Sequence, residues 1–398
     1  MPSNTPKWII DCDPGCDDAI ALALLAWKLP GSTEVEILSV AGNVSVDLTT
    51  WNACRVVAAC NRQWPVYRGC GSSLSGEAVP AASVHGRDGL GDIPNNAFNV
   101  EPSEPCNESA VRRYMVLSES RDYFVLVCTG PLTNLASALN LMSMQRQREF
   151  WQRCKFCVVM GGAFEAHGNI TAAAEFNTHF DPVAVHLVLE SWRIADTATA
   201  KDDARLDPIY FVPLDTTEMV GVPLHKASEK VGGDITSPAT PFLRAALRKY
   251  GAFHSRNCAR PVGSEGNTAF EIAGLNEKAY LEERVIGESG LTHLGAFCYL
   301  HDPLAMWMAL HREDPEFGKW WSVAYVDIDL THGRGRGQMI QHDFKKVTAT
   351  PSRSGPLGTK VLWLDPKEFG DAERQSFVSC IKKLLNIDLG SPSSTPTP

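Results

Sequence analysis

The sequence predicts an α/β fold, namely an open, mostly parallel, doubly wound (Rossmann-like) sheet with helices on both faces and a C-terminal extension. Two observations predict it. Apolar runs rich in Val and Ile alternate with helical patterns along most of the 398 residues, which is the order of repeated strand–helix–strand units. Small and polar residues also gather where successive predicted strands end, and open α/β sheets bind their ligands at that edge.

The first half of the chain carries the clearest elements. Strands are expected where short apolar runs occur, and helices where apolar residues recur every three or four positions. The expected strands are Lys7–Asp11, Val35–Ala41, Tyr123–Cys128, Lys155–Met160 and Ile209–Leu214, and the expected helices are Asp18–Trp27, Leu48–Cys60, Thr133–Leu141 and Pro182–Leu189. The last helix has a clean start, because Asp181 can cap it and Pro182 suits the first helical position.

Beyond residue 215 the pattern is weaker. Expected helices are Pro241–Phe253 with Thr240 as its N-cap, Leu304–Leu310 preceded by the N-cap Asp302 and Pro303, and Pro366–Leu385; expected strands are Val323–Leu330 and Lys360–Leu364. We expect residues 1–386 to form one domain with insertions near 194–208 and 255–290. Residues 387–398 consist mostly of Ser, Pro and Thr and predict a disordered tail.

Composition limits the partners and the compartment. A formal net charge of −9 argues against nucleic acid and anionic membranes. No segment has the ~18 uninterrupted apolar residues of a membrane span, and the N-terminus does not have the pattern of a secretory signal. Most of the twelve cysteines fall in apolar segments and are interpreted as free thiols, so a cytoplasmic location is expected. Cys154 and Cys157 have C-x-x-C spacing without a second pair, which does not indicate zinc.

An aspartate cluster follows the first expected strand. Asp11, Asp13, Asp17 and Asp18 place four carboxylates within eight residues, and no basic residue lies between Lys7 and Lys28. Carboxylates this close repel each other, so they must hold protons or share a cation. Their oxygens indicate a hard ion such as Ca²⁺ or Mg²⁺. Solvated aspartates in a turn are the alternative, but a turn between a strand and an apolar helix does not need four charges.

Two other chemistries use similar aspartate spacings. An EF-hand loop starting at Asp11 would need an acidic residue at its twelfth position, where Leu22 stands. A haloacid-dehalogenase-type phosphatase also places Asp-x-Asp after its first strand, but Pro14 and Gly15 follow Asp13 here, and Lys201-Asp202-Asp203 is a weak candidate for its later motifs. This phosphatase remains an alternative, as does a non-catalytic protein that binds Ca²⁺ or ribose.

The stretch Asp11–Leu22 resembles the N-terminal signature of the nucleoside hydrolases of the inosine–uridine-preferring type. Further motifs follow in that family's order, namely Gly42-Asn43, His85–Gly91, Thr129–Asn134, Met160–Gly162, Gly168-Asn169, Glu175–Asn177, Pro213–Asp215 and His301–Pro303. The resemblance covers about residues 7–310. It implies Ca²⁺-dependent hydrolysis of the N-glycosidic bond of purine and/or pyrimidine ribonucleosides in nucleoside salvage, by a homodimer or homotetramer.

The resemblance also implies a role for each residue. Asp13 would be the general base and a Ca²⁺ ligand. Asp18, the Thr129 carbonyl and Asp302 would complete the protein's ligands. His301 would help the base to leave, and His85 would lie near the base. The residues expected to bind ribose are Asp17 and Asn43 at the 2′-hydroxyl, Asn177 at the 3′-hydroxyl, and Glu175, Asn169 and Met160 at the 5′ end.

Two further expectations concern geometry. Glu175 and Asn177 lie two apart, so in an extended segment both would face the same side. Asp11 is expected to support the other aspartates rather than to bind the ion itself.

Overall fold

The computed structural model describes residues 5–76, 80–94, 101–199, 206–223, 237–257, 297–342 and 358–386. The predicted tail at 387–398 lies outside these residues, as do most of the predicted insertion at 255–290 and residues 200–205 of the insertion near 194–208. The single-domain prediction for residues 1–386 stays a prediction.

Within the described residues, a ten-stranded sheet runs in the order β11-β10-β12-β7-β6-β5-β1-β2-β3-β4. All its neighbouring strands are parallel except β10, which is antiparallel to both β11 and β12. The strands are β1 (Lys7–Cys12), β2 (Val35–Ser39), β3 (Val66–Arg68), β4 (Cys106–Ser109), β5 (Phe124–Cys128), β6 (Cys154–Met160), β7 (Ile209–Val212), β10 (Trp321–Ile328), β11 (Met339–Gln341) and β12 (Thr359–Leu364). A second sheet pairs β8 (Gly221–Pro223) with β9 (Phe297–Tyr299).

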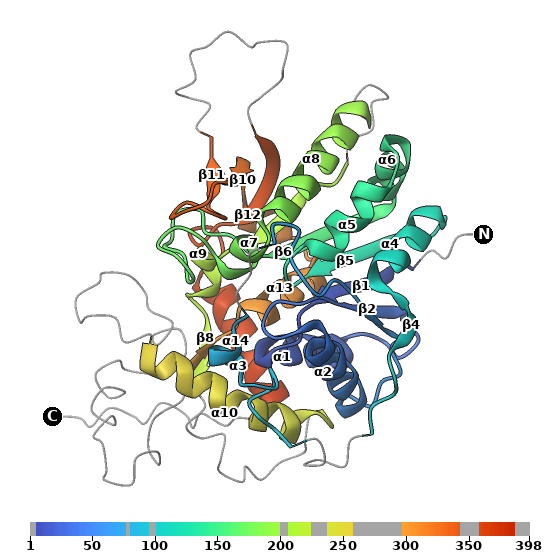
Figure 1. Cartoon of the computed structure of the whole chain (residues 1–398). Coiled ribbons are helices and arrows are strands. Elements are labelled where there is room, and N and C mark those ends of the chain that lie inside the picture. Colours follow the sequence, from blue (N-terminus) through green and yellow to red (C-terminus); the bar gives the residue numbers. More distant parts are fainter. Residues whose placement is uncertain are drawn as a thin grey trace, which may run out of the picture.

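Helices cover both faces of the large sheet (Figure 1). One face carries α1 (Cys16–Lys28), α2 (Val46–Ala59), α10 (Thr240–Asn257), α13 (His301–Leu310) and α14 (Asp371–Leu385). The other carries α4 (Ala110–Glu119), α5 (Thr133–Leu141), α6 (Met144–Arg153) and α8 (Pro182–Thr199). The short helices are α3 (Ala82–His85), α7 (Phe176–Phe180), α9 (Leu214–Thr217) and the 3-10 turn Phe317–Trp320. This arrangement confirms the predicted doubly wound α/β class.

The central strand β1 positions the aspartate cluster. It lies between β5 and β2 and is parallel to both. Helices cover both of its faces, which explains the continuous apolar run of Trp8, Ile9 and Ile10. Asp13 and the start of α1 therefore lie at the carboxyl edge of the sheet, beside Thr129 at the end of β5.

The structure differs from the sequence prediction in several elements. The strand expected at Ile209–Leu214 ends at Val212, and Leu214–Thr217 turns into α9 because the Pro213 carbonyl accepts the amides of Thr216 and Thr217. Asp302 is not the cap of its helix, since α13 begins at His301 after Leu300. The strands β3, β4, β8, β9 and β11 and the helices α3, α4, α6 and α7 were not expected. Several of them are short or largely polar, so their sequences lack a clear apolar period.

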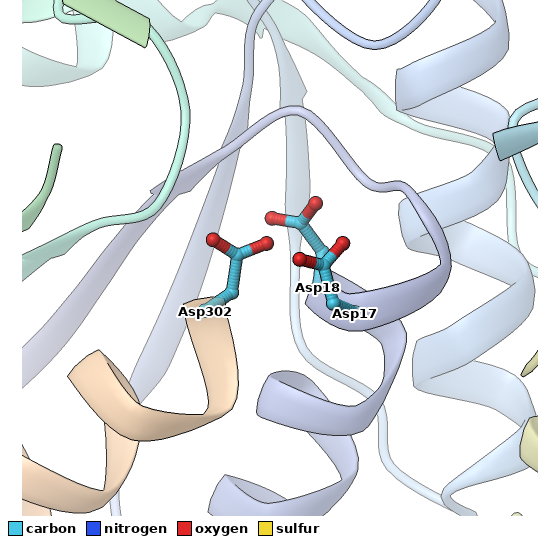
Figure 2. A group of neighbouring side chains, drawn as sticks. All are labelled: Asp17, Asp18 and Asp302. Atoms are coloured by element: carbon cyan, nitrogen blue, oxygen red, sulfur yellow. The ribbon is translucent and has the colours of Figure 1, made fainter. Parts of the chain in front are cut away.

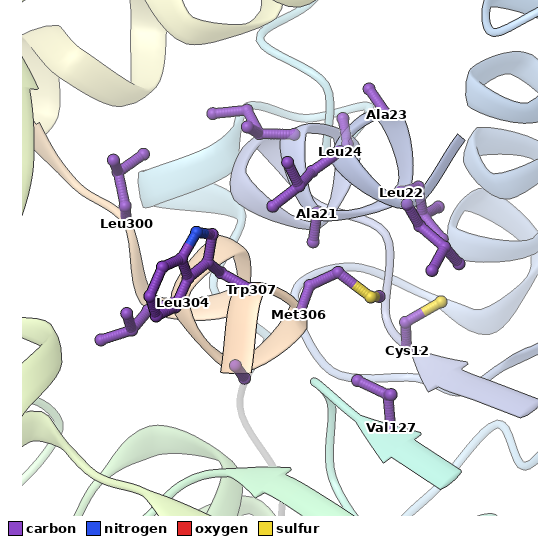
Figure 3. Close-up of a cluster of buried hydrophobic side chains, with 14 of the residues drawn as sticks. Cys12, Ala21, Leu22, Ala23, Leu24, Val127, Leu300, Leu304, Met306 and Trp307 are labelled. Atoms are coloured by element: carbon purple, nitrogen blue, oxygen red, sulfur yellow. The ribbon is translucent and has the colours of Figure 1, made fainter. Parts of the chain in front are cut away.

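Helix α1 packs directly against α13, which follows almost three hundred residues later. Figure 3 shows Leu304, Met306 and Trp307 of α13 in the same buried cluster as Ala21 and Leu22 of α1. Both helices begin at the carboxyl edge of the sheet, so this apolar contact fixes the distance between their first turns. None of the helices in the described parts of the chain is long and apolar enough to cross a membrane.

We predict that Leu304→Ala will lower the free energy of unfolding by about 2–5 kcal/mol, because it removes a fully buried side chain of α13 from the apolar cluster that this helix shares with α1. Urea denaturation followed by circular dichroism measures the change. The matched control is Leu141→Ala at a side chain that is 66% exposed, which should change stability by less than about 0.5 kcal/mol. Equal midpoints for the two variants would contradict the packing described for α13.

Candidate active site

Three carboxylates meet where α1 and α13 begin. Figure 2 shows Asp17 and Asp18 at the first turn of α1 facing Asp302 at the first turn of α13. One ligand oxygen from each lies within 4.8 Å of the others. All three side chains are at most 4% exposed. The helix N-termini add partial positive charge to the same space, which favours negative groups there.

Backbone and hydroxyl groups hold Asp18 and Asp17 in place. The Gly15 amide donates to Asp18 Oδ2 at 2.9 Å, and the Thr129 hydroxyl donates to Asp18 Oδ1 at 2.8 Å. The Tyr250 hydroxyl donates to Asp17 Oδ2 at 3.1 Å. Asp17 Oδ1 is buried and has no hydrogen-bond partner within the described chain. An unpaired buried carboxylate oxygen is costly, which indicates that this atom is meant to meet a ligand.

Asp13 lies beside this group, and two glycines leave the space that its carboxylate occupies. The Asn43 amide donates to Asp13 Oδ2 at 2.8 Å, and the Asn43 side chain donates to the Asp13 carbonyl at 3.0 Å. A Cβ atom at Gly42 would lie 2.0 Å from Asp13 Oδ2, and one at Gly130 would lie 2.6 Å from Oδ1. Both positions therefore need glycine, since any other residue would displace the carboxylate.

Burial raises the pKa of every member of the cluster, and repulsion between carboxylates adds to the rise at Asp13, Asp18 and Asp302. Burial, followed by the charge of Asp18, holds the pKa of Asp13 well above its usual value. Burial, then Asp17, then Asp18 do the same for Asp302. Burial raises the pKa of Asp17 to about 6, and burial with the Asp17 charge raises that of Asp18. A divalent cation among these oxygens would remove the repulsion, and an all-oxygen set suits Ca²⁺ or Mg²⁺.

Asp11 supports the cluster from beneath. Its carboxylate accepts hydrogen bonds from the Tyr114 hydroxyl at 2.8 Å and from the side-chain amide of Asn134 at 2.9 Å. Asn134 also donates to the Ser39 carbonyl and accepts from the Cys70 amide. The network joins the ends of β1 and β2 to the start of α5. Burial raises the pKa of Asp11 to about 7.

The expected extended arrangement of Glu175 and Asn177 is wrong. Glu175 caps α7, and its carboxylate accepts from the amides of Asn177, Thr178 and Gly162 at 2.9, 3.0 and 3.2 Å. Burial raises the Glu175 pKa to about 7 against these bonds. The Asn177 side chain donates to the carbonyls of Thr129 at 2.9 Å and Met160 at 3.3 Å. The cap therefore places Asn177 over the ends of β5 and β6.

Asn169 is not drawn into the buried cluster. Its side chain is exposed, and its Oδ1 accepts from the Phe176 amide at 2.8 Å. Asn169 therefore braces the loop that leads into α7. Met160, in contrast, is buried at the end of β6, where its sulfur accepts a hydrogen bond from the side-chain amide of Asn177 at 3.5 Å.

Two histidines lie beside the carboxylates. His85 is buried at the end of α3, where its Nδ1 accepts from the Cys16 amide at 3.1 Å and its ring lies 5.2 Å from that of Tyr250. His301 is half-buried, with its Nδ1 at 2.7 Å from the Thr217 hydroxyl. Burial lowers the pKa of each to about 4, and His85 contributes to the shift at His301. Both rings are therefore neutral at pH 7.

The sequence interpretation missed three side chains of this site. Tyr250 reaches Asp17 from α10, Thr217 reaches His301 from α9, and Tyr114 reaches Asp11 from α4. Tyr250 and Tyr114 had no local signal, because a tyrosine in a helical segment is usually part of the core. Thr217 had a weak one, since it closes the polar run that follows the fifth expected strand.

Comparison with known families gives one match over nearly the whole chain. The sequence profile described as "Inosine-uridine preferring nucleoside hydrolase" matches residues 8–369. An uncharacterized protein of Schizosaccharomyces pombe is 36% identical over 266 residues, which are 65% of this chain and 76% of that protein.

Two similar proteins with named activities match over about half of each chain. The pyrimidine-specific ribonucleoside hydrolase RihA of Photobacterium profundum is 41% identical over 46% of this chain and 56% of its own. The inosine-uridine preferring nucleoside hydrolase of Crithidia fasciculata is 36% identical over 47% of this chain and 58% of its own.

Solved structures support the fold. A plant nucleoside hydrolase superposes with a TM-score of 0.69 at 23% identity, over 96% of this chain and 100% of its own. A purine-preferring ribonucleoside hydrolase from Gardnerella vaginalis has a TM-score of 0.65 at 22% identity, over 96% of this chain and 100% of its own.

We predict that the cation-free protein loses stability as the pH rises. Asp11 and Asp17 titrate near 7 and 6 when folded and near 3.9 when unfolded. Between about pH 4 and the folded-state pKa values, the folded state therefore holds more protons than the unfolded state. Its stability falls as the pH rises through this range to about 6 and 7. Thermal melts with a chelator should show the melting temperature falling from pH 5 to pH 8.

Addition of Ca²⁺ at pH 8 should reverse this loss. A hundredfold excess over Kd stabilises by about 2.7 kcal/mol, which raises the melting temperature by several degrees. Asp47→Asn, at an exposed carboxylate in α2, is the control and should keep the wild-type response. Identical melts with and without Ca²⁺ at both pH values would contradict a cation site at this cluster.

Proposed function

The chain belongs to the inosine-uridine preferring nucleoside hydrolase family, and from this premise we propose that it hydrolyses the N-glycosidic bond of ribonucleosides to free base and ribose. The observation that carries the proposal is the buried group of Asp17, Asp18 and Asp302, with an unpaired Asp17 oxygen and Asp13 beside it. Enzymes of this family act on N-glycosyl bonds and in general depend on a metal.

Asp13 is the proposed general base. The Asn43 amide holds one of its oxygens at 2.8 Å, so the orientation of the carboxylate is fixed before substrate arrives. Asp13 would take a proton from the attacking water, whose oxygen bonds to the anomeric carbon. The C–N bond breaks with its electron pair on the base nitrogen. Attack from the side opposite the base gives inversion.

Asp13, Asp18, Asp302 and the Thr129 carbonyl are the proposed ligands of a Ca²⁺ ion, and the ribose hydroxyls or water would add further oxygens. Such an ion, when bound, lowers the pKa of a coordinated water and orients the ribose. Asp17 lies close enough to share the ion or to bind the ribose hydroxyl next to it. The surrounding carboxylates also stabilise the positive charge that develops on the sugar.

Ribose recognition is proposed for the polar groups around this centre. Asp17 and Asn43 would bind the 2′-hydroxyl, and Asn177 the 3′-hydroxyl. Met160, Glu175 and Asn169 would line the 5′ end, although Glu175 and Asn169 already bind backbone amides. Their contribution at the 5′ end is therefore mainly to shape the segment from Met160 to Asn177.

His301 and His85 are proposed to face the base. Both rings are neutral at pH 7, so each can donate one hydrogen bond without carrying a charge. His301 would help the base to leave by donating toward the nitrogen that receives the electron pair. Purine and pyrimidine nucleosides both remain in the proposed substrate class.

The family resemblance extends the proposal to the cellular role. We propose nucleoside salvage in the cytoplasm by a homodimer or a homotetramer. Light scattering on the purified chain distinguishes the two assemblies.

We predict that Asp13→Asn will lower kcat for inosine and uridine by at least about 100-fold, because it removes the base while keeping the shape of the side chain. A reducing-sugar assay measures the ribose released. A chelator should abolish ribose release, and added Ca²⁺ should restore it.

The matched control is Asp47→Asn, which should keep wild-type kcat because Asp47 is exposed and pairs with Arg68 on the surface. Equal turnover by Asp13→Asn and wild type would refute the role of Asp13. Release of phosphate from phosphomonoesters, with no ribose from any nucleoside, would instead favour the phosphatase alternative. Binding of Ca²⁺ and ribose without turnover would favour the non-catalytic one.

A second prediction concerns the sugar. Uridine should be hydrolysed at least about 1000-fold faster than 2′-deoxyuridine, as judged by kcat/KM, because the missing hydroxyl leaves buried polar groups such as Asp17 Oδ1 unpaired. Base release, followed by chromatography, measures both rates in the same enzyme preparation. Comparable rates for the two substrates would exclude a hydrogen-bonded 2′-hydroxyl.

A further inference from the structure

The short helix α9 is fixed to its surroundings by each of three consecutive side chains. The Asp215 carboxylate accepts the backbone amides of Phe164, Glu165 and Ala166 at 2.6–2.9 Å. The Thr216 hydroxyl donates to a β12 carbonyl, that of Leu364, at 2.6 Å. The third side chain, Thr217, is fully buried and meets His301.

The two-stranded sheet brings Thr217 and His301 together across 84 residues. Strand β8 follows α9 after three residues, and β9 ends two residues before His301. Gly221 pairs with Tyr299, and the Leu300 amide donates to the Val220 carbonyl at 3.4 Å. This register leaves the Thr217 hydroxyl 2.7 Å from His301 Nδ1.

The direction of this hydrogen bond follows from what else the threonine can reach. Within the part of the chain that the structure describes, His301 Nδ1 is the one hydrogen-bond partner of the Thr217 hydroxyl. A buried hydroxyl proton needs an acceptor, and leaving it without one costs about 1–3 kcal/mol. The hydroxyl therefore donates to Nδ1, which must be unprotonated. In a neutral ring the proton is then on Nε2.

His85 follows the same rule with no ambiguity. Its Nδ1 lies 3.1 Å from the Cys16 amide, and a backbone amide can only donate. The neutral His85 ring therefore also carries its proton on Nε2. The two histidines beside the carboxylate cluster are thus each fixed through Nδ1 and each present a donor on the opposite side of the ring.

We propose that Thr217 is a positioning residue that holds His301 in the tautomer with its proton on Nε2, so that this atom donates to the departing base. The inference rests on the proposed function for its substrate. According to this inference, Thr217 affects the rate of hydrolysis only for substrates whose leaving group needs a hydrogen-bond donor. A leaving group that is already stable as an anion does not need His301 or Thr217.

The test compares two kinds of substrate in three variants. Thr217→Val removes the hydroxyl and keeps the shape, and Thr217→Ser keeps the hydroxyl. Thr359→Val makes the same change at another buried threonine, which donates to the Leu189 carbonyl at 3.2 Å on the other face of the sheet. The substrates are uridine and p-nitrophenyl β-D-ribofuranoside, whose nitrophenolate leaves without a proton.

Thr217→Val should lower kcat for uridine by about tenfold or more, with KM within about twofold and with the nitrophenyl riboside unaffected. Thr217→Ser should restore most of the uridine rate, and Thr359→Val should leave both substrates at wild-type rates. Equal slowing of both substrates by Thr217→Val, or slowing of neither, would overturn the inference.

Nitrogen-15 NMR of the wild-type histidine rings gives a reading that does not depend on how well Thr217→Val folds. The His301 signals are assigned by their loss in His301→Asn. The expected result is an unprotonated Nδ1 and a protonated Nε2, and the reverse would overturn the inference. If wild type releases ribose from no nucleoside but the NMR shows this tautomer, the proposed function fails while the Thr217 contact stands.

Discussion

Apolar packing between α1 and α13 holds together carboxylates that repel each other. Asp17, Asp18 and Asp302 lie at the first turns of these two helices. The helices stay together because their separation would expose the buried apolar side chains that they share. Burial makes the repulsion stronger, because little water screens it. The positive ends of the helices and a few donated hydrogen bonds offset only part of it. Apolar packing elsewhere in the fold therefore offsets the repulsion among the carboxylates, and the site that results favours a cation.

The order of the strands determines which residues join that site. Strand β1 leads to β2 on one side and has β5 on the other, so the chain reverses its direction of travel across the sheet beside β1. Open α/β sheets bind ligands at such a point, because loops diverge there. At this edge the Thr129 hydroxyl, just after β5, donates to Asp18 at the start of α1, and the side-chain amide of Asn177 donates to the Thr129 carbonyl from α7.

Much of the site depends on local polar contacts that fix side chains before any substrate arrives. Glu175 caps α7 and thereby orients Asn177, and Asn43 orients Asp13. Asp11 is fixed in the same way, since its carboxylate accepts hydrogen bonds from the Tyr114 hydroxyl and the Asn134 side chain. Preorganised groups of this kind avoid the cost of reorganisation during the reaction. The expected extended conformation of Glu175–Asn177 failed because a capping side chain is a stronger local determinant than strand spacing.

The sequence by itself determined the α/β class, the central apolar strands and the first half of the carboxylate site. These features depend on residues close together in the chain, namely the apolar runs and the spacing of Asp11, Asp13, Asp17 and Asp18. The tertiary structure decided which distant side chains complete the site. Tyr250 contacts Asp17 from 233 residues away, and Thr217 meets His301 through the pairing of β8 with β9. Strand order and the packing of α13 on α1 set these contacts, and neither leaves a periodic pattern in the sequence.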